Sequence, residues 1–371
     1  MSKINKSKEE FGHINRHYWE WPIASYLFLG GCGGGAMFLA SILAFFVFPG
    51  GAQSALVQGA LAWPIFLSIV FLALGCVLLV GELGQPLVFI RAFVKSTSVI
   101  AWGARLLTVA MIFAVIWFAS FIPWDWFLPV ANFLVPFREF CLALAGIAGI
   151  GVVLYTGIML SSLKAHSFWA TPALPILFTI SALSTACALI ALSFGWWPMD
   201  PVFYTVNESN ANDFFTAWRV YGNAEAGLLY TAYHVMNEAL HLLHTLDVIL
   251  VACEVVVLLV MVLSFLGAGN KCANAVAHKW VHGGKWAFGF WFGMIFAGLL
   301  LPEAMYVFWS ETAASTVVAP VLVLCGGLLL RFMIVYSDER APLPGEKIYY
   351  GRLVSYKADF LHKWKYGENL F

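Results

Sequence analysis

A carboxylate, a glycine and a proline interrupt a long apolar run in the segment VGELGQPLVFIR at positions 80–91. A Glu at the margin of an apolar layer costs free energy, and such residues commonly mark a proton or ligand path. Gly84 and Pro86 break a helix, so the backbone is expected to turn directly beside Glu82. We predict that Glu82 contributes to a site at one surface of a membrane.

Further residues with proton or hydrogen-bond chemistry lie near the ends of other apolar segments, on the same predicted side of the membrane as Glu82. They are His17, Tyr26, Arg105 and Tyr155. A Tyr or His that hydrogen-bonds a carbonyl, with a carboxylate nearby to supply protons, is what quinone reduction or quinol oxidation needs. We predict Glu82 and Tyr155 as catalytic residues and all five residues as quinone contacts. The alternative interpretation makes the tyrosines interfacial anchors and pairs Glu82 with Arg91 or Arg105.

A second group of titratable residues begins in HVMNEALHLLHTLDVILVACE at 234–254. The Glu238-x-x-His241 spacing occurs in carboxylate-bridged di-metal sites, but those sites require a second copy on another helix, and the sequence has none. A hydrated face or a proton relay is the favoured interpretation, and no metal site is predicted. Charged residues inside apolar spans normally pair inward and mark ion or proton paths. The predicted proton path comprises His241, Asp247, Glu254, Glu303 and Arg331.

The composition indicates an integral membrane protein. The chain is 61% hydrophobic and 11% charged, with a mean hydropathy of +0.84, whereas soluble domains are about half apolar and about a quarter charged. A formal net charge of zero argues against a nucleic-acid partner. The seven cysteines are scattered without a CxxC motif. They are predicted to be small buried hydrophobes rather than iron–sulfur or zinc ligands.

Continuous apolar runs of about 20 residues predict an all-α protein with eight transmembrane helices. The runs are Pro22–Phe48, Leu56–Val80, Ile100–Ile122, Cys141–Ser162, Trp169–Phe194, Asp247–Leu266, Trp286–Trp309 and Thr316–Tyr336. We predict two four-helix bundles, the first at 22–166 with the quinone site, the second at 167–336 with a capping loop at 195–222. Polar segments at 1–21 and 337–371 flank them. The half-polar stretch Asn223–Thr245 meets span six without a breaker, which predicts one long helix.

The basic residues predict the topology. Eight spans put both termini on one side, and sixteen of the twenty Lys and Arg residues lie on that side, against two on the other. Because cytoplasmic loops are enriched in Lys and Arg, both termini are predicted to be cytoplasmic, in the inner (cytoplasmic) membrane. A basic face can also dock an acidic partner.

Span one carries a run of glycines, Gly30, Gly31 and Gly33–Gly35. The absence of side chains over two turns lets a neighbouring helix or a flat ligand approach closely. Helix packing is the favoured of these two interpretations.

Several motifs together resemble those of the NrfD/PsrC-type membrane subunits, the quinone-interacting subunits of polysulfide-reductase-like complexes. They are an early Trp-Pro and Tyr before a Gly-rich first span, GELGQP after span two, TSVIAWG leading into span three, and YTGIMLSSLKAHSFW after span four. The resemblance covers residues 17–195 well and the rest more loosely. It implies an eight-helix protein without haem or metal. Such a protein exchanges electrons between menaquinone or another quinone and an iron–sulfur partner subunit, with a molybdopterin or multihaem catalytic subunit beyond it.

The resemblance also assigns roles to single positions. Tyr26 and Tyr155 match positions where the family has quinone-contacting polar residues, and Glu82 matches the acidic residue before LG-x-P. Gln85 departs from the Arg often found there. Arg331 and the carboxylates of spans six to eight resemble residues proposed to carry protons in related complexes. Many members face partners outside the cytoplasm, whereas the basic-residue count places the Glu82 corner inside, so the side of the partner stays open.

The predicted function is therefore that of a membrane subunit of a respiratory oxidoreductase, with or without proton translocation. An ion- or proton-coupled secondary transporter is the alternative, since it would use the intramembrane Glu, Asp and Arg residues. Transporters favour repeats in both halves, and the sequence shows no strong repeat. A haem b quinol oxidoreductase needs histidines on facing helices, but the histidines cluster in one segment.

Overall fold

The computed structural model describes residues 21–48, 55–82, 99–120, 126–164, 166, 168–195, 226–267, 271–309 and 314–337; at 55–59, 82, 195, 226–237, 271 and 314 only the backbone is described. Within these segments the chain is helical, with turns and no strand. Among the described residues, eight helices are long and apolar enough to cross a membrane: Trp21–Val47, Ala60–Gly81, Val99–Ala119, Leu128–Ser161, Ala173–Phe194, Glu238–Gly267, Lys285–Phe308 and Ser315–Val335. The predicted all-α class and the eight spans are confirmed.

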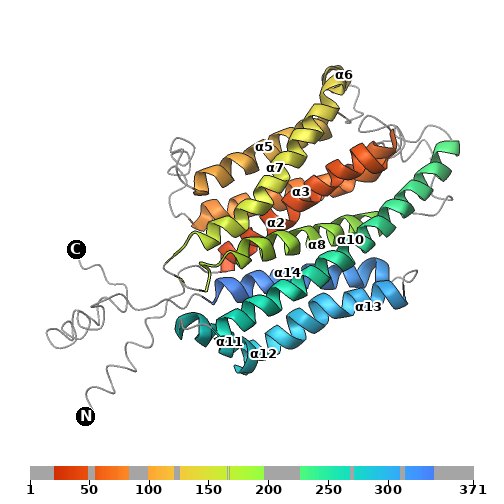
Figure 1. Ribbon diagram of the computed structural model, residues 1–371. Helices are drawn as coiled ribbons and strands as arrows, with labels where there is room; N and C mark the ends of the chain where they lie inside the picture. Colours follow the sequence, from red (N-terminus) through yellow and green to blue (C-terminus); the bar gives the residue numbers. More distant parts are fainter. Residues whose placement is uncertain are drawn as a thin grey trace, which may run out of the picture.

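Figure 1 shows these helices as a bundle, with α11 and α12 at one end and α6 at the other. The first half contains α2 (Trp21–Ile42), η1 (Leu43–Val47), α3 (Ala55–Glu82), α5 (Val99–Ala119), α6 (Leu128–Leu134), η3 (Val135–Phe137) and α7 (Arg138–Ser161). The second half contains α8 (Ala173–Gly195), α10 (Ala226–Gly267), α11 (Lys271–His282), α12 (Lys285–Phe288), η6 (Gly289–Leu300), α13 (Leu301–Phe308), η7 (Ala314–Val318) and α14 (Ala319–Val335).

Helix α2 lies at the centre and packs against α3, α7, α8 and α14. Its glycines explain how so many helices reach it. A Cβ added at Gly34 would lie 2.8 Å from the carbonyl oxygen of Gly149 on α7, and one added at Gly35 would lie 2.9 Å from that of Ala182 on α8. Gly33 faces Phe71 on α3 in the same way. The favoured interpretation of the glycine run, close packing of helices, is confirmed for these positions.

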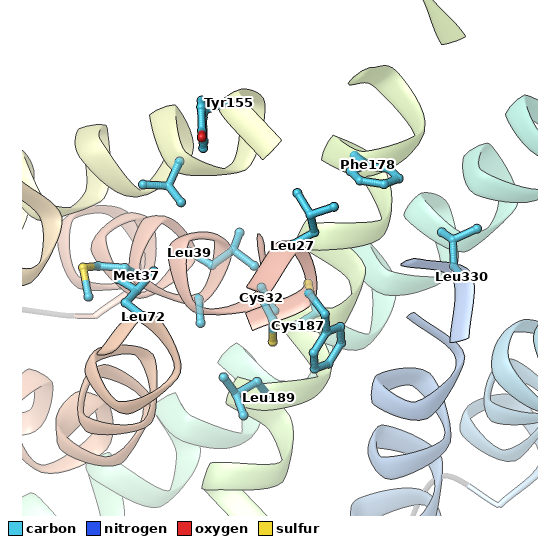
Figure 2. Close-up of a cluster of buried hydrophobic side chains, with 14 of the residues drawn as sticks. Leu27, Cys32, Met37, Leu39, Leu72, Tyr155, Phe178, Cys187, Leu189 and Leu330 are labelled. Atoms are coloured by element: carbon cyan, nitrogen blue, oxygen red, sulfur yellow. The ribbon is translucent and has the colours of Figure 1, made fainter. Parts of the chain in front are cut away.

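The core extends across both halves of the chain. Figure 2 shows buried side chains from α2 (Leu27, Cys32), α7 (Tyr155), α8 (Phe178) and α14 (Leu330) in one cluster. Many large apolar side chains on the outer faces of the spans are exposed instead. That pattern suits a bundle surrounded by lipid, because lipid tails solvate apolar side chains as well as a protein core does. The division into two four-helix bundles stays a prediction.

Two helices of the second half that carry charged residues have unusual geometry: α10 is very long, and the seventh span contains a π-helix. α10 is one helix of 42 residues, which confirms the predicted long helix over its described part. The seventh span contains a π-helix, η6, of 12 residues before Pro302. Proline lacks an N–H and its ring collides with the carbonyl four residues back, so a wider helical turn before Pro302 has a local cause.

Candidate functional site

Tyr26 of α2 and Tyr155 of α7 come together inside the first half of the bundle. Their side chains are 1% and 4% exposed, and their hydroxyl groups lie within hydrogen-bonding reach of each other. Gly30 and Gly75 border the Tyr26 ring, where added Cβ atoms would lie 3.8 and 3.4 Å from ring carbons. The structure therefore brings together two of the predicted quinone contacts, from spans one and four.

The Tyr155 hydroxyl donates its hydrogen bond to the Sδ of Met159, at 2.9 Å. A thioether sulfur is a weak acceptor, so a carbonyl oxygen would be a stronger partner for this hydroxyl. The Tyr155 ring lies on the backbone of Gly103 in α5, where an added Cβ would overlap the ring carbons. Next to Tyr155, Leu154 and Ile158 are 43% and 46% exposed. The tyrosine is thus buried close to the outer, apolar surface of α7.

Of the other three predicted quinone contacts, the structure describes the side chain of Arg105 alone. Glu82 is the last residue of α3, but its side chain lies outside the described part of the chain, as do His17 and the residues that follow Glu82 up to Ser98. Arg105 is half-buried on α5, with its guanidinium carbon 5.5 Å from the centre of the Trp102 ring. Residues two apart point to different sides of a helix. Arg105 therefore does not share the face on which Gly103 meets Tyr155.

A second cluster of titratable side chains lies between α8, α10 and α13. Asp247 is 1% exposed, and Glu303 and the Ser184 hydroxyl are within its electrostatic or hydrogen-bonding range. Neither carboxylate has a direct hydrogen-bond partner among the described residues, and the Ser184 Oγ has none either. The ring of His244 stacks on Tyr306, with centroids 4.2 Å apart and an interplanar angle of 25°. Tyr306 in turn lies near both carboxylates.

Arg331 continues this cluster towards α8 and α2. It is fully buried and donates hydrogen bonds to the Ser181 hydroxyl, to the carbonyl oxygen of Phe178 at 3.2 Å and to that of Gly327 at 3.3 Å. Its positive charge lies within electrostatic range of Glu254, which is 2% exposed and also within reach of Ser181. A buried charge is costly unless it is paired and hydrogen-bonded. The Nη1 and Nη2 atoms of Arg331 are hydrogen-bonded and Glu254 lies in electrostatic range, whereas its Nε has no hydrogen-bond partner among the described residues.

These contacts place four of the five residues of the predicted proton path in one buried cluster. Asp247, Glu254, Glu303 and Arg331 belong to it, whereas His241 is exposed on α10. His241 is nevertheless close enough to His244 to interact electrostatically. Positions 241 and 244 are three residues apart, as are 244 and 247, so each pair is adjacent on the surface of α10.

Sequence reasoning missed several residues of both sites. The sequence did not indicate a role in either site for Met159, Gly103, Tyr306, Ser181 or Ser184. The spacing of Glu303 and Tyr306, one turn apart, was the one available signal for Tyr306. Gly103 and Met159 carry no sequence signal, since only the packing of α5 on α7 reveals their contact with Tyr155.

The tyrosine pair and the charged cluster lie at different faces of helix α2, which itself carries Tyr26. Gly30 borders Tyr26, while a Cβ on the neighbouring Gly31 would lie 3.8 Å from the Nη2 of Arg331. Phe28 of α2 also reaches Gly327, one turn before Arg331. Helix α2 therefore contacts Tyr155 of α7 on one face and Arg331 of the charged cluster on another. In the described part of the chain, no group of three or more His, Cys, Asp or Glu side chains is arranged to hold a metal ion.

The chain matches the family model described as polysulphide reductase, NrfD, over residues 9–196 and 224–339. Protein NrfD of Escherichia coli (strain K12) is 28% identical over 352 residues, which span 88% of this chain and 96% of that protein. The C subunit of the polysulfide reductase of Wolinella succinogenes is 25% identical over 353 residues, 91% of this chain and 99% of that protein. The NrfD homolog of Haemophilus influenzae is 24% identical over 352 residues, 88% of this chain and 96% of that protein.

The family match extends over both halves of the bundle, including the tyrosine pair and the charged cluster. It confirms the resemblance that the sequence motifs indicated. This chain is a multi-pass membrane protein and belongs to the NrfD family of polysulphide reductase membrane subunits.

Proposed function

We propose that this protein is the quinone-reactive membrane subunit of a respiratory oxidoreductase complex. It exchanges electrons between the quinone pool, with menaquinone as the favoured member, and an iron–sulfur partner subunit. A molybdopterin or multihaem catalytic subunit lies beyond that partner. Membership of the NrfD family supports the role in an oxidoreductase complex. One of the relatives is named as a subunit of a polysulfide reductase.

The observation that carries the proposal is the hydrogen bonding of Tyr155. A buried phenol normally donates to a strong acceptor, yet among the described residues the Tyr155 hydroxyl donates to the thioether of Met159, with the Tyr26 hydroxyl within reach. A quinone carbonyl is a stronger acceptor, and Tyr26 offers a second hydroxyl beside it. The residues present therefore fit a quinone headgroup, which approaches from the apolar outer surface next to Tyr155.

Each residue of this site has a proposed task. Tyr26 and Tyr155 donate hydrogen bonds that hold and orient the quinone ring. Glu82, where α3 ends, exchanges protons with the aqueous surface, and His17 and Arg105 complete the polar rim. A quinone supplies the two-electron, two-proton chemistry when it is bound. The protein residues supply orientation and proton transfer, a contribution of roughly 10²- to 10⁴-fold for a well-placed acid or base.

The charged cluster is proposed as a proton path, with His241 at its exposed end. Protons would pass from His241 to His244, then to Asp247 and Glu303, and on to Glu254 next to Arg331. Two buried carboxylates with no direct hydrogen-bond partner among the described residues support this role, because an unpaired ionised carboxylate in an apolar layer is costly and favours binding a proton. Location in the cytoplasmic membrane, with both termini in the cytoplasm, is proposed from the basic-residue count.

Gentle-detergent purification of the tagged chain tests this proposal. Co-purifying subunits are identified by mass spectrometry, and extracted quinone is identified by chromatography. An iron–sulfur protein together with bound menaquinone is the expected result. A chain recovered alone and without quinone would contradict the proposal and favour the secondary transporter. An export signal on the partner, or its absence, decides on which side of the membrane it sits.

A further inference from the structure

Helix α11 is an amphipathic helix that connects the ends of two spans. It follows the end of α10 and precedes the seventh span, which begins at Lys285. Asn274 donates hydrogen bonds from Nδ2 to the carbonyl oxygens of Phe265 and Leu266, at 3.3 and 2.9 Å. It thereby satisfies the last carbonyl groups of α10, which a helix end leaves without partners. This bond fixes α11 against the end of its preceding span.

One side of α11 is anchored in the protein core. Trp280 is fully buried, and its indole N–H donates to the Ser337 hydroxyl at 2.9 Å. The Trp280 ring contacts Phe168 and Phe290, with centroids 5.2 and 5.5 Å apart. Val276 and Ala277 share the buried side. α11 is therefore a fixed part of the fold and presents its opposite side to the surroundings in one orientation.

The outer side of α11 is basic. His278 and His282 are exposed one turn apart, with ring centroids separated by 5.9 Å. Lys285 follows directly and is also exposed. Lys279 places its Nζ 4.5 Å from the centre of the Trp286 ring. No Asp or Glu occurs from Val255 to Pro302, so no acid of this segment neutralises the basic side.

An aromatic ladder begins one turn after Lys285. Phe288, Phe292 and Phe296 stack in sequence, with centroids 5.0 and 5.7 Å apart. Their side chains are 66%, 52% and 47% exposed, on a span that crosses the apolar layer. The ladder thus leads from the basic groups down the lipid-facing surface of the seventh span.

We propose that this surface binds an anionic phospholipid. Lys285, His278 and His282 contact the phosphate of the headgroup, and one acyl chain lies along the Phe288–Phe292–Phe296 ladder. The pairing of a basic group at the membrane surface with an apolar track below it matches the two chemical parts of such a lipid. Basic residues next to a span bind anionic headgroups in this manner. The inference is independent of the proposed quinone site, which lies on α2, α3, α5 and α7.

The test uses the intact complex purified in mild detergent from wild type, from Lys285→Gln and from the triple variant Lys285→Gln, His278→Gln, His282→Gln. Phosphatidylglycerol and phosphatidylcholine retained per protein are measured by native mass spectrometry. Delipidated samples then receive phosphatidylglycerol, phosphatidylcholine or inorganic phosphate, and the shift in Tm is recorded. Lys164→Gln is the matched control, because Lys164 is an exposed lysine three residues after the end of α7 and is not part of the α11 segment or the Phe288–Phe292–Phe296 ladder.

Lys285→Gln is expected to weaken phosphatidylglycerol binding about fivefold, the contribution of one basic group near an anionic surface, and the triple variant more. Lys164→Gln leaves binding unchanged, and inorganic phosphate alone does not raise the Tm. Phe288→Ala with Phe292→Ala should also weaken binding without changing the headgroup preference. Equal retention of both lipids, or wild-type retention by the triple variant, overturns the proposal. Loss of an acidic partner subunit from the triple variant, with lipid content unchanged, would also overturn it and assign the surface to a protein.

Discussion

The ring of Tyr155 lies directly on the backbone of Gly103, so closely that a Cβ at position 103 would overlap the ring. This contact joins α5 to α7 and fixes the phenol that faces Tyr26. Any side chain at position 103 must move Tyr155 or separate the two helices. The position of the proposed hydrogen-bond donor therefore depends on a glycine that has no chemistry of its own.

Gly103→Ala is predicted to lower quinone turnover by displacing Tyr155, and to lower the free energy of unfolding by about 1–3 kcal/mol, as overpacking usually does. Quinol oxidation rates and the Tm of the purified complex measure the two effects. Gly81→Ala is the control, because no atom of the described residues lies within 4 Å of a Cβ at that position. If both variants behave alike, the contact with Tyr155 does not matter for turnover.

Tyr155→Phe and Glu82→Gln are each predicted to slow quinone turnover while the complex still assembles. Phe keeps the packing on Gly103 but removes the hydroxyl, and Gln keeps the shape of Glu82 but cannot exchange a proton. The expected loss is on the order of 10²-fold, measured as menaquinol-linked electron transfer in membranes. Normal rates in both variants would remove these residues from the site.

Asp247→Asn is predicted to abolish proton translocation with little effect on electron transfer to quinone. Asn fills the same volume in the cluster with Glu303 and Ser184 but cannot carry a proton along the path. The proton-to-electron ratio of proteoliposomes containing the complex is the measurement. Glu238→Gln serves as the control, since Glu238 is exposed near the start of the same span. An unchanged ratio in Asp247→Asn would contradict the proposed path.

Arg331→Ala is predicted to impair proton coupling or assembly more than quinone affinity. Removing the guanidinium leaves Glu254 without its positive neighbour and the Ser181 hydroxyl without its donor. Breaking a buried charge pair costs about 3–5 kcal/mol. The Tm, the proton-to-electron ratio and the KM for quinol separate the effects. Arg331→Lys, which keeps the charge, should be affected less, whereas a change in KM alone would contradict the assignment.

The spans were predictable because their cause is local. Apolar runs of about 20 residues and their flanks determine where a polypeptide crosses a membrane, and the eight predicted spans match eight helices. Inward placement of Asp247, Glu254 and Arg331 followed from the cost of exposing charge to lipid. Neither property depends on which helices contact one another.

The partners of those residues were not predictable from the sequence. Stacking of His244 on Tyr306 and the contact of Gly103 with Tyr155 depend on how distant helices are oriented about their axes. An apolar span reads as hydrophobic on all sides, so its sequence gives little information about the face it turns to a neighbour. His241 is exposed whereas Asp247, six residues later on the same helix, is buried. This difference results from how α10 is oriented about its axis.

Photoaffinity labelling with an azido-quinone tests the central claim most directly. The intact complex is irradiated with the probe, with and without excess menaquinone, and labelled peptides are mapped by mass spectrometry. The account predicts labelling in α2, α5 and α7 around Tyr26, Gly103 and Tyr155, suppressed by menaquinone. Labelling confined to α10 and α13, or labelling that menaquinone does not suppress, would contradict a quinone site at the tyrosine pair.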